Sequence, residues 1–287
     1  MQENLIKLIP TMPELIQQPI RVQRQRIKPA TFGNKILSII IPTYNEEDSI
    51  STILEKINDV DLIQGIRKEI IVVNDCSTDQ TDLVIKEYLL ETPQANISYF
   101  VHPKNKGKGA AIHTGIEHAT GDYLLIQDAD LEYDPGEYNS LLKPVLAGHA
   151  DIVYGSRFMG GNPHRILFFW HTWGNKLLTI ISNIFTNLNL TDAHTCYKLV
   201  PTSIVRSISL EEKRFSFDVE LNVKISRIPG IRIYEVGIAY YGRTFAEGKK
   251  IRIKDAFSSI WCLIKYSVFK REDVSKRRSI ITTMPKA

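Results

Sequence analysis

The sequence predicts an α/β fold in which a mostly parallel β-sheet is flanked by helices and followed by a helical C-terminal extension. Continuous apolar runs of about five residues, rich in β-branched side chains, alternate with longer segments of helical apolar spacing. Polar residues directly follow several of these runs, as they do at ligand sites of open α/β sheets. No internal repeat is apparent, which favours one main domain over an array.

The strands and helices are expected in a regular order up to Ser156. Apolar runs predict strands at 37–41, 69–73, 97–101, 123–127 and 151–155. Helical spacing predicts helices at 46–60, 78–90, 107–119 and 135–147. Such alternation indicates βαβ units and strands that are covered on both faces.

After Ser156 this alternation stops. We expect an amphipathic helix within 165–190, a short apolar run at 197–200, a further element at 215–226, a late strand at 231–238 and a final helix at 254–269. The predicted organisation is an N-terminal arm over 1–35, a main domain over 36–250, and an amphipathic helix with a basic tail over 251–287.

Charge and composition exclude several classes of protein. The net charge of +4 is too small to indicate nucleic-acid binding. Basic residues gather in 21–35 and in the C-terminal tail, which fits contact with an anionic membrane face and fits solubilising tails equally well. The 3 cysteines lack metal-ligand spacing, and neither a secretory signal nor an apolar run of about 18 residues is visible. A cytoplasmic protein is expected, with any membrane contact peripheral.

The segment 124–134 carries the clearest chemical signal. An apolar run ends in four acids: Asp128, Asp130, Glu132 and Asp134. Carboxylates one residue apart at the end of a buried strand suit a hard divalent cation and substrate phosphates. The alternative for this segment alone is a solvated acidic turn. Asp134, beside Pro135, is expected to cap the next helix.

Two other strand ends carry polar groups that would share the same crevice. Pro42 and Tyr44 are candidate walls for a ring-bearing ligand, and Asp75 is a candidate acceptor for a base or ribose. Asp79 or Ser77 is expected to cap the following helix. The glycines and lysines of 105–110 open a helix and fit a phosphate-binding turn or, with equal weight, an ordinary flexible turn.

These motifs, in this order, resemble the inverting family 2 glycosyltransferases of the GT-A fold. Within that family the closer resemblance is to the polyprenyl-phosphate (dolichol-phosphate) mannose and glucose synthases. The motifs that carry it are Ile-Pro-Thr-Tyr-Asn-Glu-Glu (41–47), Val-Asn-Asp-Cys-Ser-Thr-Asp (73–79), Asn-Lys-Gly-Lys-Gly (105–109), Gln-Asp-Ala-Asp-Leu-Glu-Tyr-Asp (127–134), Tyr-Gly-Ser-Arg-Phe (154–158), Thr-Asp-Ala-His-Thr-Cys-Tyr-Lys (191–198), Phe-Asp-Val-Glu-Leu (217–221) and Gly-Arg-Thr-Phe-Ala-Glu-Gly-Lys-Lys-Ile (242–251). The resemblance covers about residues 37–266.

The resemblance implies a nucleotide-sugar donor bound with Mn²⁺ or Mg²⁺. Asp128 and Asp130 match the family's DXD metal pair, and Glu132 matches a further ligand to the metal or its waters. The implied nucleotide-binding residues are Pro42, Tyr44, Glu46, Asp75, Lys106 and Asp128. Asn74 and Cys76 depart from the usual Asp-Asp-Gly-Ser, but Asp75 remains, so activity is expected.

The resemblance also implies the residues around the reaction. Arg157 and Arg243 match basic residues near the phosphates; Lys249 and Lys250 fit that role or an exposed basic loop. Asp192 and Asp218 are the candidate bases for a hydroxyl acceptor, with a turn cap as the alternative for Asp192. A lipid phosphate needs no strong base, and Arg157, Lys198 or Arg243 would then attract it.

The acceptor is the least defined part of this prediction. The apolar helix within 167–190 fits a position at a membrane interface near a polyprenyl chain, or packing on the sheet or on another subunit of a homo-oligomer. The first hypothesis is therefore transfer of a hexose to a polyprenyl phosphate. The alternatives are a soluble hydroxyl acceptor and a nucleotide-binding relative without turnover. The donor base and sugar, UDP-glucose or GDP-mannose, stay open.

Overall fold

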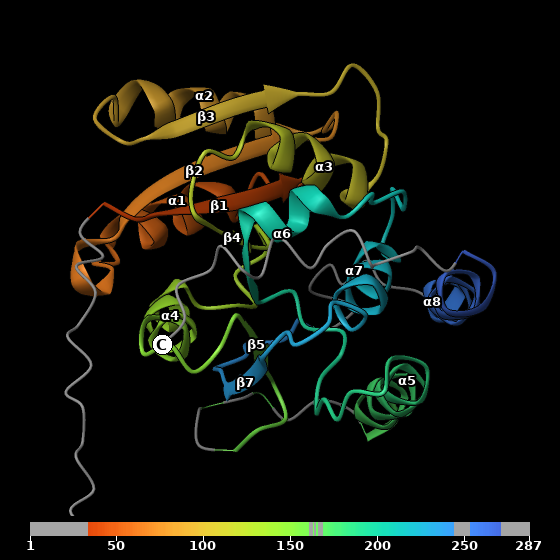
Figure 1. Ribbon diagram of the computed structural model, residues 1–287. Coiled ribbons are helices and arrows are strands. Elements are labelled where there is room, and N and C mark those ends of the chain that lie inside the picture. Colours follow the sequence, from red (N-terminus) through yellow and green to blue (C-terminus); the bar gives the residue numbers. More distant parts are fainter. Residues whose placement is uncertain (1–33, 161–162, 164, 166–168, 244–252, 271–287) are drawn as a thin grey trace, which may run out of the picture. The chain divides into compact units, whose positions relative to one another are not determined.

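The computed structural model describes residues 34–160, 163, 165, 169–243 and 253–270. These residues contain a seven-stranded sheet with the order β3-β2-β1-β4-β6-β5-β7 (Figure 1). The expected fold class, a mostly parallel sheet flanked by helices with helices at the C-terminal end, is confirmed. Most of the expected arm and basic tail, and Lys249 and Lys250, lie outside the described residues.

One half of the sheet is parallel throughout. It consists of β3 (Ile97–Val101), β2 (Arg67–Asn74), β1 (Ile36–Thr43) and β4 (Tyr123–Ile126). Ile39 lies beside Ile70 of β2 and Leu125 of β4, so the three strands are in register at their apolar centres. The strands predicted at 37–41, 69–73, 97–101 and 123–127 are therefore present.

The other half contains the antiparallel contacts. Strand β6 (Lys198–Pro201) runs antiparallel to both β4 and β5 (Ile152–Ser156), and β7 (Ile233–Gly237) pairs parallel with β5. The apolar run expected at 197–200 is thus the strand that joins the two halves of the sheet. The predicted strands at 151–155 and 231–238 are also present, within one or two residues.

Helices cover both faces of the sheet, because neighbouring residues of each strand point to opposite sides. Ile39 and Ile41 pack with α1 (Ile50–Asp59), α2 (Thr81–Glu91) and α4 (Tyr138–Leu146). Ile40 packs on the other side with α3 (Lys108–His118), α6 (Thr202–Ser207) and α7 (Phe217–Ile225). The sequence did not predict the short helix α6 or the 3₁₀ turn at Ile63–Gly65, and the helix predicted at 135–147 consists of a 3₁₀ turn at Pro135–Glu137 followed by α4.

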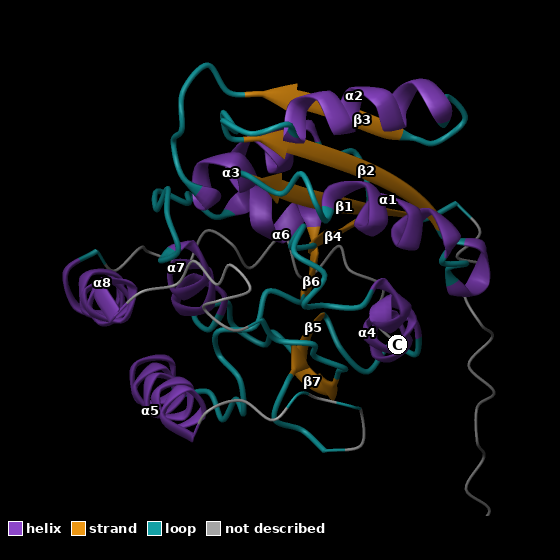
Figure 2. Ribbon diagram, turned by 180° about the vertical axis from the view of Figure 1, so that it is seen from behind, coloured by secondary structure: helices purple, strands orange, loops and turns teal. Residues whose placement is uncertain are grey.

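The last helices form a further layer outside α7. Helix α8 (Ile253–Ile264) continues into a π-helical turn (Lys265–Phe269), and the two bury Cys262, Leu263 and Tyr266 against α7. Helix α5 (Phe169–Thr186) packs on α7 and α8, and Figures 1 and 2 both show the three helices grouped together. No helix in the described ranges combines the length and the apolar character needed to cross a membrane.

Candidate functional site

The carboxyl ends of β1, β2 and β4 meet at one edge of the sheet, as the sequence predicts. The amide of Asp75 donates to Thr43 O (2.8 Å), and the amide of Gln127 donates to Ile40 O (2.9 Å). Across the first two loops, the amide of Asn45 donates to Ser77 Oγ (3.0 Å). Three segments that are distant in sequence therefore form one polar edge.

Asp128 and Asp130 follow β4 at this edge, and each is paired with a cation. Asp128 Oδ1 lies 2.6 Å from Lys108 Nζ, and Asp130 Oδ2 lies 2.8 Å from Arg243 Nη2. Their side chains keep 15% and 18% of their surface exposed, so both carboxylates remain within reach of a ligand. The turn that separates them from Glu132 requires a positive φ of 63° at Leu131.

The two carboxyl groups differ in their tendency to ionise. Burial by itself would raise the pKa of Asp128, but the Lys108 ammonium, hydrogen bonds from Cys196 and Lys108, and the charge of Arg243 together hold the pKa below its ordinary value. Burial, followed by the charges of Asp128 and Glu132, raises the pKa of Asp130 to about 7. The positive charge of Arg243 lowers the pKa of Asp130, but by less than burial and the two neighbouring carboxylates raise it.

Glu132 is held by the chain segment that carries Arg243. Its carboxylate accepts hydrogen bonds from Tyr240 Oη (2.7 Å) and from the backbone amide of Arg243 (2.6 Å), and Glu132 is only 8% exposed. This geometry favours a role in placing Arg243 beside Asp130. Direct ligation of metal by Glu132 stays a prediction, and no group of three His, Cys, Asp or Glu residues arranged to hold a metal occurs in the described part of the chain.

The oxygen atoms of this site fit a metal ion whose coordination shell is completed by substrate. Asp128 and Asp130 supply hard carboxylate oxygens from one turn, next to two cations that suit phosphate oxygens. Mg²⁺ and Mn²⁺ are commonly held by one or two carboxylates together with substrate phosphates and water. The residues therefore fit a divalent cation that binds together with a diphosphate.

The predicted nucleotide-binding residues line the same edge but already have partners. Asp75 is 2% exposed and accepts hydrogen bonds from the amides of Lys106 (2.9 Å) and Gly107 (2.7 Å). Glu46 accepts from Ser49 Oγ (2.9 Å) and pairs with Arg243 (3.5 Å). Pro42 is half-buried, Tyr44 is 37% exposed and the Lys106 side chain is exposed. Their contacts with nucleotide stay predictions.

Helix capping near these loops agrees with the sequence. Asp79 accepts a hydrogen bond from the amide of Thr81, the first residue of α2 (3.1 Å), whereas the Ser77 hydroxyl is used by Asn45. Asp134 accepts from the amide of Gly136 (3.0 Å) at the start of the Pro135–Glu137 turn. Asp134 is thus a cap, as expected.

The glycines of the 105–110 turn serve close backbone packing. A Cβ at Gly107 would lie 2.5 Å from Lys213 O, and a Cβ at Gly109 would lie 2.5 Å from Glu212 O. The amide of Ala110 donates to Lys213 O (3.0 Å), so segment 212–214 covers the start of α3. The amides of Lys106 and Gly107 donate to Asp75 and that of Ala110 to Lys213 O, and phosphate binding by this turn stays a prediction.

Gly109→Ala is expected to destabilise the protein by about 1–3 kcal/mol, because the new methyl group would force segment 212–214 away from α3. Thermal unfolding measures the change. Gly174→Ala is the matched control: it adds the same methyl group in helix α5, where nothing lies within 4 Å. That control should be neutral or slightly stabilising. Equal melting temperatures for wild type and Gly109→Ala would contradict the packing role.

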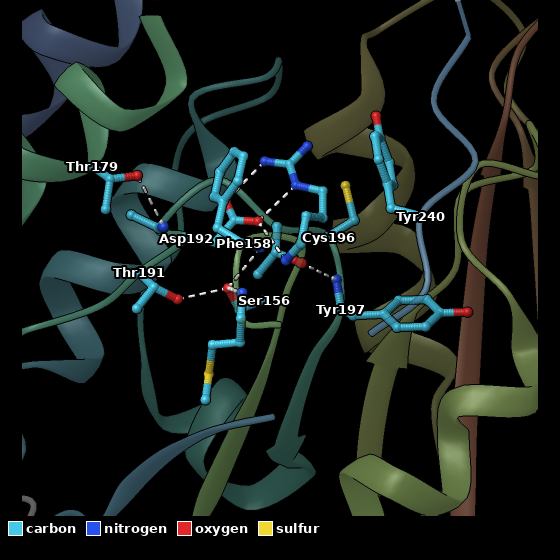
Figure 3. A network of polar contacts seen from close by, with 12 residues as sticks. Ser156, Phe158, Thr179, Thr191, Asp192, Cys196, Tyr197 and Tyr240 are labelled. Atoms are coloured by element: carbon cyan, nitrogen blue, oxygen red, sulfur yellow. Dashed lines mark hydrogen bonds and ion pairs between the residues drawn. The ribbon is translucent and has the colours of Figure 1, made fainter. Parts of the chain in front are cut away.

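Arg157 and Asp192 form a buried bidentate ion pair (Figure 3). Arg157 Nε donates to Asp192 Oδ2 (2.6 Å) and Nη2 to Oδ1 (2.8 Å), with side-chain exposures of 11% and 0%. The Arg157 guanidinium also lies 5.1 Å from the centre of the Tyr240 ring. Burial alone would raise the pKa of Asp192, but Arg157 outweighs it and holds the pKa below its ordinary value. This geometry favours Asp192 as a residue that positions Arg157, and its role as a base stays a prediction.

Asp218 is the more accessible of the two candidate bases. Its carboxylate lies 2.9 Å from Lys198 Nζ, with 19% of the Asp218 side chain exposed and none of Lys198. Lys198 is anchored by Thr195 O and by the Tyr154 ring, 5.3 Å from its nitrogen. A buried lysine thus holds Asp218 at the site, as Arg157 holds Asp192.

The sequence analysis named Lys106 of the Asn-Lys-Gly-Lys-Gly motif as a nucleotide-binding residue, which stays a prediction, and did not single out Lys108. The structure places Lys108 against Asp128, and Lys106 is joined to the site through its backbone amide. Cys196 was also missed: its Sγ lies 3.2 Å from Lys108 Nζ. The available signal was the position of Lys108 at the start of the helix predicted at 107–119.

Comparisons with known proteins agree with this arrangement. Residues 38–209 match the model of Glycosyl transferase family 2. A dolichyl-phosphate beta-glucosyltransferase of Trichomonas vaginalis is 30% identical over an alignment of 280 positions that covers 88% of this chain and 83% of that protein. A low-salt glycan biosynthesis hexosyltransferase of Haloferax volcanii is 30% identical over 72% of this chain, but this chain spans only 48% of its length.

A solved structure shows the same fold. Glucosyl-3-phosphoglycerate synthase from Mycobacterium tuberculosis, crystallised with Mn²⁺, uridine diphosphate and phosphoglyceric acid, aligns with a TM-score of 0.63 at 17% identity. The alignment covers 83% of this chain and 80% of that one.

Proposed function

Because the chain belongs to glycosyl transferase family 2 and is a glycosyltransferase, we propose that it moves a hexose from a nucleotide sugar to a polyprenyl phosphate, with Mn²⁺ or Mg²⁺ as cofactor. The donor would be of the UDP-glucose or GDP-mannose type. The observation that carries the proposal is the edge where Asp128 and Asp130 lie beside Lys108 and Arg243. Two acids for a metal and two cations for phosphates match a metal-bound nucleoside diphosphate.

The relatives support both the lipid acceptor and the metal-bound nucleotide of the proposed reaction. The Trichomonas protein is named for transfer of glucose to dolichyl phosphate. The mycobacterial enzyme was crystallised with Mn²⁺ and uridine diphosphate. We extend both features to this chain as parts of the proposal.

In the proposed reaction an oxygen of the acceptor phosphate attacks the anomeric carbon of the sugar. The bond between that carbon and the β-phosphate oxygen breaks, and the nucleoside diphosphate leaves with the electron pair. The divalent cation supplies Lewis-acid stabilisation of the diphosphate. Arg243 and Lys108 would stabilise the same developing charge through hydrogen bonds that need no reorientation of water.

The acceptor phosphate is already anionic, so no strong base is needed. This fits the two candidate bases, because Asp192 is fully buried and paired with Arg157, and Asp218 is paired with Lys198. In the proposal the acids hold the cations in place, and the cations attract the phosphate. A hydroxyl acceptor would instead need one of these carboxylates to leave its partner and accept a proton.

A membrane lipid acceptor is further supported by an exposed apolar surface on α5 and α8. The exposed side chains recur at helical spacing along one stripe of α5, at Phe169, Trp173, Leu177, Ile180 and Ile184, and the neighbouring helix α8 also exposes Phe257 and Trp261. Ile184 is 74% exposed and Phe257 71%, which is unusual for apolar residues on adjacent helices. We propose that this apolar stripe lies on the cytoplasmic face of a membrane.

Replacing Ile180 and Trp261 together by Glu is expected to weaken binding to anionic lipid vesicles by about tenfold or more, because both apolar side chains would leave the lipid interface. Co-sedimentation with vesicles measures the change. Leu90→Glu is the control, since Leu90 is 82% exposed on the distant helix α2. Unchanged vesicle binding by the double variant, together with loss of self-association in solution, would assign the stripe to a subunit interface instead.

Transfer to extracted lipid tests the proposed function. The protein is incubated with radiolabelled UDP-glucose or GDP-mannose, Mn²⁺ and undecaprenyl or dolichyl phosphate. Label is expected in the organic phase for one donor. Label that stays in water with every lipid but enters a soluble acceptor would overturn the lipid acceptor and leave the donor chemistry standing. Nucleotide binding without donor consumption under any acceptor would overturn the catalytic proposal.

A further inference from the structure

Each of the two candidate metal ligands, Asp128 and Asp130, is paired with a cation of the chain. Lys108 comes from the first turn of α3 and Arg243 from the segment after β7, yet both reach the same acidic turn. Asp128 Oδ1 has the Lys108 ammonium at 2.6 Å. A divalent cation held by that oxygen would face the Lys108 ammonium, and the two positive groups would repel each other.

The two cations are not held equally. Arg243 is fixed by Asp130, by Glu46 at 3.5 Å and by the hydrogen bond of its backbone amide to Glu132. Lys108 is a flexible side chain, 25% exposed, whose nitrogen contacts Asp128 and Cys196 Sγ and lies 6.0 Å from the Phe215 ring. Lys108 is therefore the cation that can leave its carboxylate without breaking the loop that carries it.

We propose that Lys108 is an exchangeable counter-ion. Its ammonium pairs with the Asp128 carboxylate before metal binds and moves to the donor diphosphate when the divalent cation binds. This rests on the proposed function, because it takes a nucleoside diphosphate and a metal as the ligands. The metal displaces Lys108 from Asp128, and the diphosphate then receives the displaced ammonium. Metal and nucleotide thus bind with positive cooperativity, and each strengthens the other by the same factor.

The geometry also explains why a metal ion would bind weakly to this site in the absence of a diphosphate. Without a diphosphate, the displaced ammonium of Lys108 would lose a carboxylate partner and stay next to the dication. With a diphosphate present, the ammonium gains a phosphate partner in the same crevice. Lys108 is by this argument a positioning residue that couples two ligands, in addition to any charge it places near the leaving group.

Manganese binding, with and without uridine diphosphate, tests the proposal without any turnover. Free Mn²⁺ is measured by electron paramagnetic resonance during titration of the full chain. For the wild type, uridine diphosphate should strengthen Mn²⁺ binding by about tenfold or more, within the range usual for coupled sites. In Lys108→Met, Mn²⁺ alone should bind several-fold more tightly than in the wild type. The factor by which uridine diphosphate strengthens Mn²⁺ binding should be a small fraction of the wild-type factor.

Two further variants and two contrary results complete the test. Lys108→Arg keeps the positive charge and should retain the coupling, and Lys104→Met removes an exposed lysine outside the acid site and should match the wild type. Unchanged Mn²⁺ affinity and unchanged coupling in Lys108→Met would overturn the counter-ion role while leaving the proposed function intact. A wild type that binds neither Mn²⁺ nor a nucleoside diphosphate, with uridine and guanosine diphosphate each tried alone and together with Mn²⁺, would overturn both.

Discussion

Asp130→Asn is expected to lower glycosyl transfer by about 10²- to 10³-fold, because an amide oxygen replaces an anionic metal ligand at the point where the leaving diphosphate develops charge. The overall fold should persist, since the Asp130 side chain is 18% exposed and its partner Arg243 is also held by Glu132. Initial rates at saturating donor, with circular dichroism as the check on folding, measure the effect.

Asp134→Asn is the matched control for that variant. Asp134 lies in the same acidic segment, but its carboxylate caps the turn at Pro135–Glu137 by accepting from the Gly136 amide. An asparagine can accept the same hydrogen bond, so transfer should change little. Full activity of the wild type in the presence of EDTA would show that the metal assignment is wrong.

Asp192→Asn is expected to destabilise the fold by about 3–5 kcal/mol, since it leaves the buried Arg157 guanidinium without its charge partner. For a chain of this size that corresponds to a fall of roughly 10 °C in melting temperature. Thermal unfolding at neutral pH measures the loss. Asp82→Asn, in the exposed pair with Lys86, should cost less than about 1 kcal/mol and serves as the control.

The pH dependence of this pair has a definite sign. The folded pKa of Asp192 is depressed because Arg157 outweighs burial, so the pair stabilises the fold above the ordinary carboxyl pKa near 4. That stability is lost as the pH falls through the depressed folded pKa, and Asp192→Asn should flatten this part of the acid-unfolding profile. An Asp192→Asn variant with unchanged stability and no transfer would identify Asp192 as the catalytic base.

The parallel half of the sheet could be predicted because its strands are continuous apolar runs with helices between them. The antiparallel direction of β6 could not be predicted, because four buried residues indicate a buried strand but do not indicate its direction. The start of α1 was also missed by four residues, since residues 46–49 form a turn in which the Ile50 amide donates to Glu46 O (3.0 Å) and the helix begins at Ile50. The direction of a strand depends on its pairing partners, which are distant in sequence, and the exact ends of a helix depend on the local backbone conformation.

The acids of the site could be predicted from the end of β4, but their partners could not. Asp128 meets Lys108 from α3, and Glu132 meets Arg243, 111 residues further along the chain. The contact of Asp75 with nucleotide stays a prediction, but the sequence did not show that its carboxylate also accepts hydrogen bonds from the amides of Lys106 and Gly107. The sequence places the chemical groups at strand ends, whereas long-range packing decides which group neutralises which.

The most direct test of the account is mass spectrometry of the lipid formed from a nucleotide sugar, Mn²⁺ and a polyprenyl phosphate. The account predicts one new lipid, heavier than the acceptor by a single hexose, with the sugar attached to the phosphate oxygen. The same lipid should be absent with EDTA and nearly absent with Asp130→Asn. Unmodified acceptor together with a hexose on a soluble hydroxyl compound would contradict it.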